Sequence, residues 1–317
     1  MGASLTTLGD YARTSRATPP NPRTAWLLNL GAEVELEDAR RTLGAAARAR
    51  LPELAGRLGA LVRPTDILLF GDPDEAKRAE GAVGRAWLPT PRALAALAQA
   101  GARVPAAPAY EVLRRVNDRR FSLALGATLP GQRTVATLDE VREALAAPSP
   151  GGNWLLRRPH GFAGRGRRRA REDEVLGAAR GWIEASLRSF GALVVEPWVD
   201  RVADFGWHGF VSREGRTSLG APTWQETAPD GTWLATRPAK PGEIGREETE
   251  LLAQAVEQAG AALAAAGYFG PFGLDAFRWR DEKGNLQFNP RCEINARYSM
   301  GWGIGMGERR PDLDPEE

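Results

Sequence analysis

Apolar and polar residues along the first third of the chain alternate in blocks of two kinds. Short apolar runs at 25–30 and 66–70 are suited to buried strands, whereas 39–61 and 91–100 carry Ala and Leu at helical spacing. Each strand candidate is followed by a helix candidate. This order predicts an α/β unit with a parallel sheet, which we place at 25–108.

From residue 109 onward the same patterns predict a mixed α and β region that ends in a hairpin. Helical spacing is found at 111–126, 139–147, 171–190 and 247–266. Strand patterns occur at 153–156, 192–195, 205–212 and 218–226. The polar turn 281–285 separates the last two strand segments, 273–279 and 286–297, which we interpret as a hairpin.

Length and composition narrow the class of protein. The 317 residues suffice for about two structural units, and 43% hydrophobic with 26% charged residues is ordinary for a globular protein. The net charge of +2 gives no electrostatic case for nucleic acid or an anionic membrane as partner. A single cysteine, Cys292, forms no internal disulfide, and no apolar run is long enough for a membrane helix, so we expect a cytoplasmic protein.

The two ends of the chain differ from the rest in composition. Residues 1–24 are polar and end in a proline-rich stretch, and residues 307–317 combine proline with charge. We expect a disordered arm at the N-terminus and a disordered tail at the C-terminus.

The most informative segment is the C-terminal hairpin. In a tight hairpin centred on Gly284, Asp275 and Glu293 are equally distant from the turn and therefore face each other. Pro290 lies inside the second strand, where it cannot donate to the ladder and favours a bulge. The turn thus sets a register that a bulge can shift.

Strand periodicity gathers the polar residues of the hairpin on one face. Glu293, Asn295 and Arg297 alternate with Cys292 and other less polar neighbours, so they share the face on which Asp275 lies. Two carboxylates and an amide oxygen beside a guanidinium suit Mg²⁺ with phosphate, because Mg²⁺ takes one or two carboxylates and completes its shell with substrate oxygens and water. The alternative interpretation is a solvent-exposed polar face.

A glycine-containing loop follows the strand candidate at 153–156. Two arginines at 157 and 158 precede Gly161, Gly164 and Gly166. Glycine lets backbone N–H groups approach phosphate oxygens closely. The spacing matches neither the P-loop nor the dinucleotide-binding fingerprint, so the loop is interpreted either as an anion cradle or as a plain turn.

Taken in order, these segments resemble the ATP-grasp superfamily from Val116 to Gly303. The segment Val-Asn-Asp-Arg-Arg-Phe at 116–121 is similar to the family's entry to the lid and places Arg119 where a lysine usually contacts the nucleotide phosphates. Leu-Arg-Arg-Pro at 156–159 is similar to the strand that bears the second phosphate-binding cation, which places Arg158 there. The glycine loop follows as it does in the family.

The resemblance continues through the hinge and the hairpin. Val-Val-Glu-Pro-Trp-Val at 194–199 resembles the hinge strand, which implies that main-chain groups of Glu196, Trp198 and Val199 bind adenine. The nearest match to the acidic residue that commonly holds the ribose hydroxyls is Asp204. The metal ligands implied by the resemblance are Asp275, Glu293 and Asn295.

The resemblance implies both a fold and a site. The ATP-grasp fold implies an α/β chain with an N-terminal parallel α/β domain, a mixed α+β lid at about 118–195 and a C-terminal antiparallel-sheet subdomain. The ATP-grasp domain would then span 109–306, with ATP and Mg²⁺, or Mn²⁺, bound between its two α+β subdomains. Arg297 matches an arginine that in many members stabilises the transferred phosphoryl group or acyl phosphate.

The implied activity is that of an ATP-dependent ligase. Most members activate a carboxylate as an acyl phosphate for attack by an amine or related nucleophile, so the expected partners are small-molecule carboxylates and amines. Both lid lysines of the family are arginines here, and a guanidinium binds phosphate bidentately. An ATP-grasp-like kinase and a catalytically inactive nucleotide-binding protein are the alternatives, and a homodimer is left open.

Overall fold

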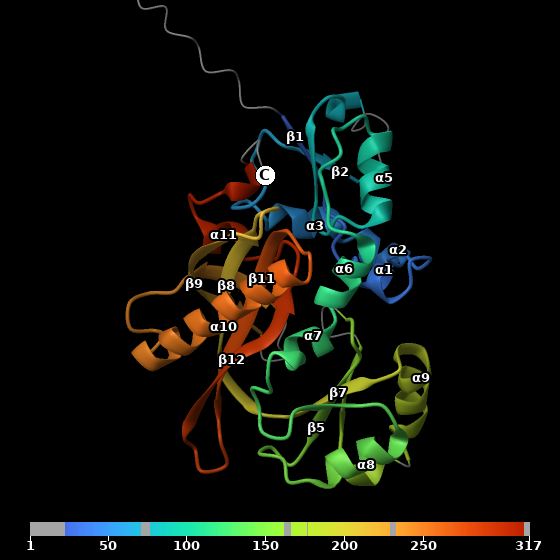
Figure 1. Cartoon of the computed structure of the whole chain (residues 1–317), viewed down its shortest axis with the longest axis vertical. Helices are drawn as coiled ribbons and strands as arrows, with labels where there is room; N and C mark the ends of the chain where they lie inside the picture. The colour runs from blue at the N-terminus through green and yellow to red at the C-terminus, as the bar shows by residue number, and fades with distance from the viewer. Residues whose placement is uncertain (1–22, 71–76, 162–165, 176, 229–232, 314–317) are drawn as a thin grey trace, which may run out of the picture.

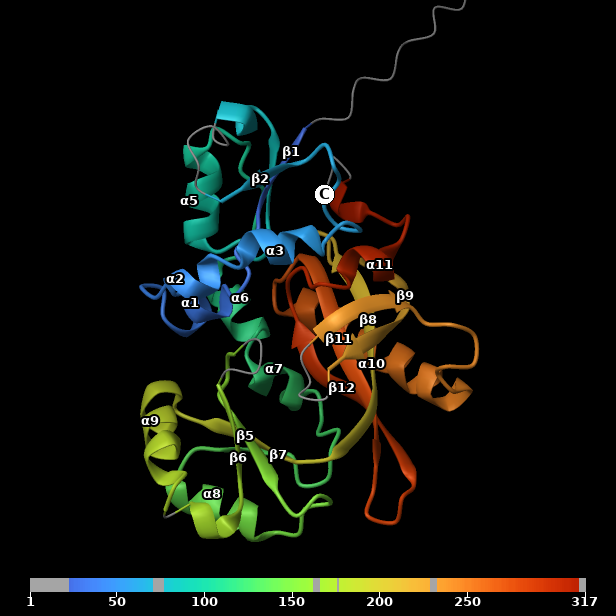
Figure 2. The same cartoon turned by 180° about the vertical axis from the view of Figure 1, so that it is seen from behind.

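The computed structural model describes residues 23–70, 77–161, 166–175, 177–228 and 233–313. Within these residues the strands form three sheets that follow one another along the sequence. Figures 1 and 2 show the N-terminal sheet at the top, the sheet of the lid at the bottom, and the five-stranded C-terminal sheet between these two levels. The expected succession of a parallel α/β unit, a mixed lid and an antiparallel sheet is therefore confirmed.

The N-terminal unit is a parallel sheet in the order β2-β1-β3. Its elements are β1 (Thr24–Leu27), α1 (Glu33–Glu37), α2 (Ala45–Arg48), α3 (Leu51–Gly56), β2 (Ile67–Leu69), β3 (Val83–Ala86) and α5 (Pro91–Gln99). One continuous helix over 39–61 is wrong, because this segment contains two short helices, α2 and α3, and α3 begins anew with a proline in its first turn. The α5 helix begins as predicted, since the Thr90 hydroxyl accepts from the Ala93 N–H at 3.3 Å.

The lid is an antiparallel sheet in the order β4-β7-β5-β6 with helices on one face. Helices α6 (Tyr110–Val116) and α7 (Arg119–Ala124) lead into it. Its elements are β4 (Arg133–Val135), α8 (Leu138–Ala146), β5 (Trp154–Arg157), β6 (Arg167–Ala170), the 3-10 turn η1 (Glu172–Glu174), α9 (Arg180–Phe190) and β7 (Leu193–Pro197). Trp154 and Leu156 of β5 belong to the core that α8 and α9 cover. The even-numbered residues of β5 thus face the helices.

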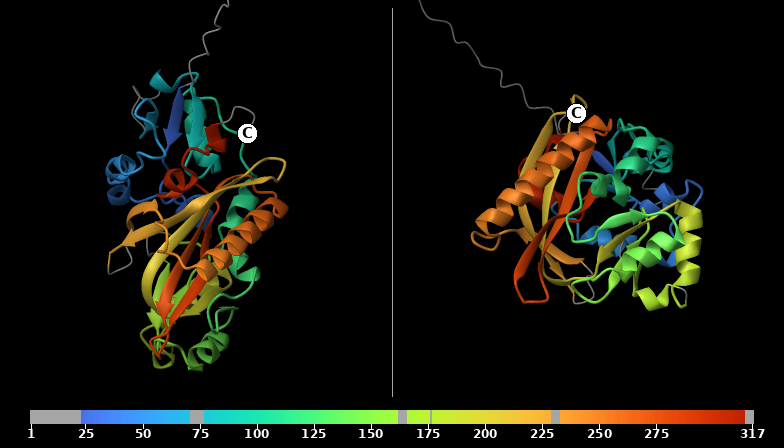
Figure 3. Two further views of the ribbon diagram at one scale, coloured as in Figure 1. Left: turned by 90° about the vertical axis from the view of Figure 1, so that its left-hand side faces the viewer. Right: turned by 60° about the horizontal axis from the view of Figure 1, so that its bottom comes forward.

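The C-terminal unit is an antiparallel sheet in the order β10-β9-β8-β11-β12. Its elements are β8 (Asp200–Val211), β9 (Thr217–Thr227), β10 (Trp233–Pro238), α10 (Arg246–Ala265), β11 (Gly270–Arg280), β12 (Leu286–Asn295), α11 (Trp302–Met306) and the 3-10 turn η2 (Pro311–Leu313). Figure 3 shows the long α10 lying along this sheet. The strands β11 and β12 are the hairpin that the sequence predicts.

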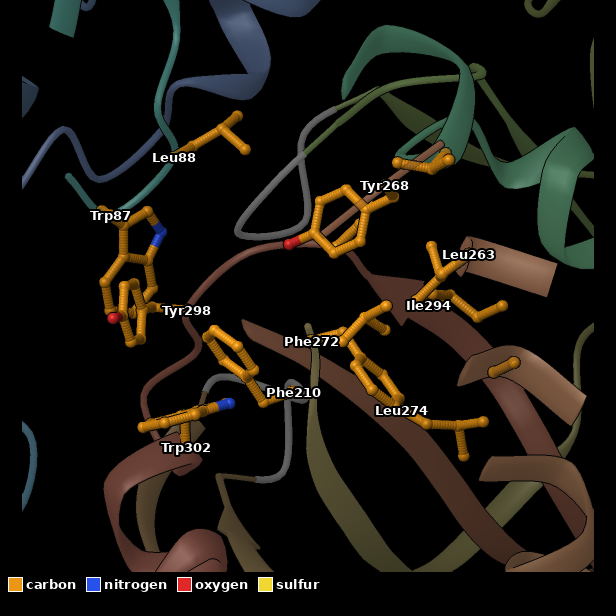
Figure 4. Close-up of a cluster of buried hydrophobic side chains, with 14 of the residues drawn as sticks. Trp87, Leu88, Phe210, Leu263, Tyr268, Phe272, Leu274, Ile294, Tyr298 and Trp302 are labelled. Atoms are coloured by element: carbon orange, nitrogen blue, oxygen red, sulfur yellow. The ribbon is translucent and has the colours of Figure 1, made fainter. Parts of the chain in front are cut away.

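One large buried cluster holds the five-stranded sheet against the N-terminal unit. It combines Trp87 with Phe210, Tyr298 and Trp302, which lie close together in Figure 4. The rings of Tyr298 and Trp302 meet edge to face with centroids 5.1 Å apart. Since burying one such side chain stabilises a fold by about 1.5–3 kcal/mol, this cluster fixes the end of the hairpin relative to the N-terminal unit.

The C-terminal tail is not disordered throughout, contrary to the expectation for 307–317. Asp312 in η2 is buried and accepts from the Tyr298 hydroxyl at 3.1 Å and from Arg310 at 2.8 Å. These contacts anchor the chain up to 313 because they satisfy a buried carboxylate. The expected arm overlaps β1 at Thr24, and residues 1–22 lie outside the described residues.

None of the helices in the described residues combines the length and the apolar character that a membrane span requires.

Candidate functional site

The polar face of the β11–β12 hairpin is the centre of the site. Asp275 and Glu293 lie directly opposite each other, and Gly273 lies opposite Asn295. The register shifts between Asp275 and Phe277, beside the stretch of β12 that contains Pro290. The predicted pairing of the two carboxylates and the bulge near the proline are both observed.

Asp275 is held by two amide groups. Its Oδ1 accepts from Gln225 Nε2 of β9 at 2.9 Å, and its Oδ2 accepts from Asn295 Nδ2 at 2.9 Å. Burial raises the pKa of Asp275, and the neighbouring charge of Glu293 raises it further. A cation placed between these carboxylates would relieve both effects.

Glu293 lies between two arginines of the lid segment. Its Oε1 accepts from Arg119 at 3.0 Å and its Oε2 accepts from Arg157 at 2.6 Å. Burial alone would raise the pKa of Glu293, but the charges of Arg119 and Arg157 outweigh burial and lower this pKa to about 2. Glu293 is therefore ionised at neutral pH.

Arg119 also fixes the start of the glycine loop. It is the first residue of α7, and its guanidinium donates to the carbonyl oxygens of Arg158 at 3.0 Å and Gly161 at 3.1 Å. Gly166 has a φ of 73° and accepts from the Arg158 N–H at 2.8 Å. Gly164 lies outside the described residues. The predicted phosphate cation and the described ends of the predicted loop are thus in contact.

Arg158, the predicted second phosphate cation, faces the helices of the lid, whereas its neighbour Arg157 reaches the carboxylates. The Arg158 guanidinium lies 5.0 Å from the Trp182 ring and donates to Ser186 Oγ of α9 at 2.9 Å. Arg157, on the opposite face of β5, instead donates to Glu293 and to Glu196. Alternation along the strand explains the difference, because the even-numbered side chains face the helices.

The hinge residues also make side-chain contacts within the site. Glu196 is buried and uses its carboxylate to bind Arg157 at 3.1 Å and Gln132 at 3.2 Å. The backbone N–H of Trp198 donates to the Asn153 carbonyl oxygen at 2.9 Å, so this group is already bonded. Val199 is buried in an apolar cluster with Phe277, against which Cys292 packs. An apolar floor therefore joins the hinge to the hairpin.

Asp204 lies on β8 with both carboxylate oxygens engaged. Oδ1 accepts from Arg201 at 3.2 Å and Oδ2 accepts from the Thr227 hydroxyl at 3.1 Å. Asp204 pairs in register with Phe277 of β11, two positions along from Asp275. Asp204 therefore lies beside Phe277, at the edge of the apolar floor and on the same face of the sheet as Asp275.

Arg297, the predicted catalytic arginine, is bound by the N-terminal unit. Its Nε donates to Glu33 Oε1 at 2.6 Å, and its Nη1 donates to the Tyr298 carbonyl oxygen at 2.9 Å. Glu33 is the first residue of α1, and its second oxygen is buried without a partner in the described structure. The arginine thus lies where the N-terminal unit meets the end of the hairpin.

A small pocket brings several of these side chains together. Arg119, Arg157, Glu196 and Cys292 are among the residues that line it. Burial raises the pKa of the Cys292 thiol, with the nearby Arg201 opposing this, so the thiol is not activated as a thiolate. The pocket therefore gathers guanidinium groups that are already bonded to carboxylates, and it holds no cysteine nucleophile.

The donor set of the hairpin fits Mg²⁺. Among the described residues, no cluster of three or more His, Cys, Asp and Glu side chains could hold a metal ion. Mg²⁺ needs no such cluster, because one or two carboxylates suffice when substrate phosphates and water supply the remaining oxygens. Asp275, Glu293 and the side-chain amide of Asn295 provide this minimal set on one face of the hairpin.

Three contacting residues are absent from the sequence-based site. Arg157 follows the apolar run Trp154, Leu155 and Leu156, which shows no alternation, so only the structure tells which of the two arginines faces the hairpin. Gln225 is one of several polar residues that the sequence places near the expected cleft without assigning it a role. Glu33 comes from a distant part of the chain and carries no local signal, because only the tertiary fold brings it to the hairpin.

Comparison with solved structures defines the class of fold. No protein-family model and no curated protein sequence matches the chain. Solved structures do match, and they show that the chain has the ATP-grasp fold, as its motifs indicate.

Three of these structures represent the likeness. The D-cycloserine synthetase DcsG aligns with a TM-score of 0.51 at 16% identity, covering 92% of this chain and 100% of that one. An N5-carboxyaminoimidazole ribonucleotide synthetase from Thermus thermophilus aligns at 0.50 and 21% identity, covering 87% and 71%. The N5-carboxyaminoimidazole synthetase from Staphylococcus aureus, complexed with ADP, aligns at 0.50 and 14% identity, covering 92% and 73%. At these identities the likeness concerns the fold.

Proposed function

We propose that the protein is an ATP-dependent ligase that activates a carboxylate as an acyl phosphate for attack by an amine or related nucleophile. The observation that carries the proposal is the facing pair Asp275 and Glu293, with two arginines of the lid segment bound to Glu293. The likeness in fold to two kinds of synthetase supports it.

Arg119 and Arg157 would hold the nucleotide phosphates. In the structure they neutralise Glu293 at 3.0 and 2.6 Å, and a phosphate could replace this carboxylate because guanidinium groups bind either anion bidentately. Bound Mg²⁺ would supply charge neutralisation at Asp275, Glu293 and Asn295. Phosphate would then compensate the charges of Arg119 and Arg157, and Mg²⁺ would compensate the carboxylates of Asp275 and Glu293.

The apolar floor would receive the adenine base. Val199 and Phe277 lie in this buried cluster, and the Arg201 guanidinium lies 3.8 Å from the centre of the Phe277 ring, so a flat ring would take the place of Arg201 there. Asp204 lies on the same side and would accept hydrogen bonds from ribose hydroxyls. Its present partner Arg201 is partly exposed, so this contact can open.

Arg297 would stabilise charge on the transferred group. The amine nitrogen attacks the carbonyl carbon of the acyl phosphate, the bond from carbon to the bridging oxygen breaks, and phosphate leaves with the electron pair and one amine proton. Arg297 would hold the oxygens of the leaving phosphate, a role that requires a cation fixed in advance. Its bond to Glu33 fixes it.

Calorimetric titration of a non-hydrolysable ATP analogue with Mg²⁺ tests the nucleotide site. We expect saturable binding by the wild type and weaker binding by Glu293→Gln. The matched control is Glu250→Gln, which removes an exposed acid that pairs with Arg246 on α10. Absence of binding to folded wild-type protein would refute the proposal.

Product analysis separates a ligase from a kinase. A ligase releases ADP and free phosphate only when carboxylate and nucleophile are both present, whereas a kinase releases ADP and leaves phosphate on the acceptor. A simpler partial reaction uses acetyl phosphate and Mg·ADP, from which the proposed site would form ATP, as measured by luciferase. Substrate-dependent ADP without free phosphate would favour the kinase.

A further inference from the structure

His208 of β8 is enclosed by three glycines. A Cβ built on Gly305 would lie 2.3 Å from His208 Nδ1, one on Gly273 would lie 3.1 Å from Cδ2, and one on Gly206 would lie 3.4 Å from Cε1. The first two distances are closer than ordinary van der Waals contact. The backbone therefore makes room for an imidazole ring that is 2% exposed.

The ring lies on the same face of the sheet as the carboxylates. His208 pairs with Gly273, which in turn pairs with Asn295, and the neighbouring row consists of Gly206, Asp275 and Glu293. Since Gly273 has no side chain, His208 leans over it, with Nε2 3.6 Å from the position of the absent Cβ. The Nε2 edge is thus turned toward the hairpin, whereas Nδ1 is turned toward α11.

The surroundings of Nδ1 decide which nitrogen carries the proton. Nδ1 is buried without a hydrogen-bond partner in the described structure, and the backbone of Gly305 lies against it. A buried N–H without an acceptor is less tolerable than a buried lone pair, so the proton belongs on Nε2. Burial lowers the pKa of His208 to about 4, which keeps the ring neutral at physiological pH.

We propose that His208 is a neutral hydrogen-bond donor to the carboxylate substrate, presenting Nε2–H to the oxygen that becomes the carbonyl of the acyl phosphate. The inference rests on the proposed ligase function. When the amine attacks the carbonyl carbon, negative charge develops on this oxygen, and a donor already in place stabilises it. The Ser299 hydroxyl, buried and without a partner, lies 3.3 Å from the same absent Cβ of Gly273 and marks a second polar group there.

Nitrogen-15 NMR of the histidine rings tests the tautomer directly. The chain has 2 histidines, so the variant His160→Gln assigns both sets of resonances. His160 is an internal control, because its Nε2 bonds the Arg114 carbonyl oxygen at 2.9 Å. We expect His208 to be neutral at pH 7 with the proton on Nε2. A proton on Nδ1, or a charged ring at pH 7, would overturn the proposal.

The contact itself is tested with acetate as the probe. In the presence of saturating Mg·ADP, we expect acetate titration to shift the Nε2 and attached proton resonances of His208 and to leave those of His160 unchanged. An unchanged His208 ring at saturating acetate would overturn the contact. Nucleotide affinity measured on the same sample shows separately whether the proposed function holds.

Two amide substitutions provide a matched pair. Gln in His208→Gln can place its NH₂ near the position of Nε2, whereas Asn in His208→Asn reaches only the position of Nδ1. Phosphoryl transfer from acetyl phosphate to Mg·ADP returns negative charge to the acetate oxygens that Nε2–H would contact. In this formation of ATP we therefore expect His208→Gln to lose about tenfold or less and His208→Asn about a hundredfold. Equal rates with equal nucleotide affinity would show that the ring has only a structural role.

Discussion

The buried imidazole of His208 makes a quantitative prediction about stability and pH. The folded-state pKa is about 4 against an ordinary value of 6.5, with burial as the cause. Because the folded-state value is the lower one, the unfolded chain takes up the proton first as pH falls through 6.5. The wild type therefore loses stability between the two pKa values.

The size of this loss follows from the two pKa values. Between about pH 7.5 and about pH 5, the unfolded state gains roughly 2 kcal/mol from protonation of His208, whereas the folded ring stays neutral. The ring is surrounded by Gly206, Gly273 and Gly305, and Asp275 is the titratable group in the next row of the same face. His208→Gln lacks this protonation, so it should not share the loss.

Urea unfolding followed by tryptophan fluorescence measures the effect, since the chain has 10 tryptophans. The gap in unfolding free energy between wild type and His208→Gln should narrow by about 2 kcal/mol from about pH 7.5 to about pH 5. His160→Gln is the control. The difference in unfolding free energy between wild type and His160→Gln should change less with pH, because a hydrogen bond to a carbonyl oxygen opposes the effect of burial on the pKa of His160. A His208→Gln gap that is constant within about 0.5 kcal/mol would refute the reasoning.

Three further predictions concern the charged residues of the site. Arg157→Gln should weaken binding of the Mg·ATP analogue about tenfold or more, whereas Arg158→Gln should change this binding by less than about threefold. Equal effects of the two substitutions in calorimetry would contradict the proposed role of Arg157. Glu33→Gln should lower the rate of ATP formation from acetyl phosphate with unchanged nucleotide affinity, because it loosens Arg297; an unchanged rate would exclude that role. Glu293→Gln should lower the free energy of unfolding by about 2–3 kcal/mol, since it leaves two guanidiniums with less compensation, and urea unfolding beside Glu250→Gln checks this.

The hairpin shows how far strand periodicity can lead. Asp275 and Glu293 face each other as predicted, but nearer the turn Phe277 faces Asn289. If the pairing of Phe277 with Asn289 continued along the strands without a bulge, Arg291 would lie opposite Asp275. The bulge beside Pro290 restores the pairing of the carboxylates, so the predicted pair is correct only because turn and bulge act together.

The lid shows a choice that strand periodicity does not make, because Trp154, Leu155 and Leu156 are all apolar. Arg157 and Arg158 are adjacent, and motif similarity alone selects the second. In the structure Trp154 and Leu156 fill the core under the helices, Arg158 shares their side, and Arg157 lies on the other side. The short strands β3, β4 and β6 have at most 4 residues each, too few for a periodic signal to emerge from the sequence.

The ion pair between Glu33 and Arg297 marks the limit of local patterns. The two residues are 264 positions apart, and Glu33 begins a short helix whose sequence resembles any acidic surface helix. The shared core, in which Trp87 lies with Tyr298 and Trp302, brings α1 to the end of β12. A carboxylate and a guanidinium buried together compensate each other's loss of hydration, so the fold can bury the arginine where the proposed reaction needs it. The position of Arg297 is therefore a property of the whole chain, whereas the order of the motifs can be read from the sequence.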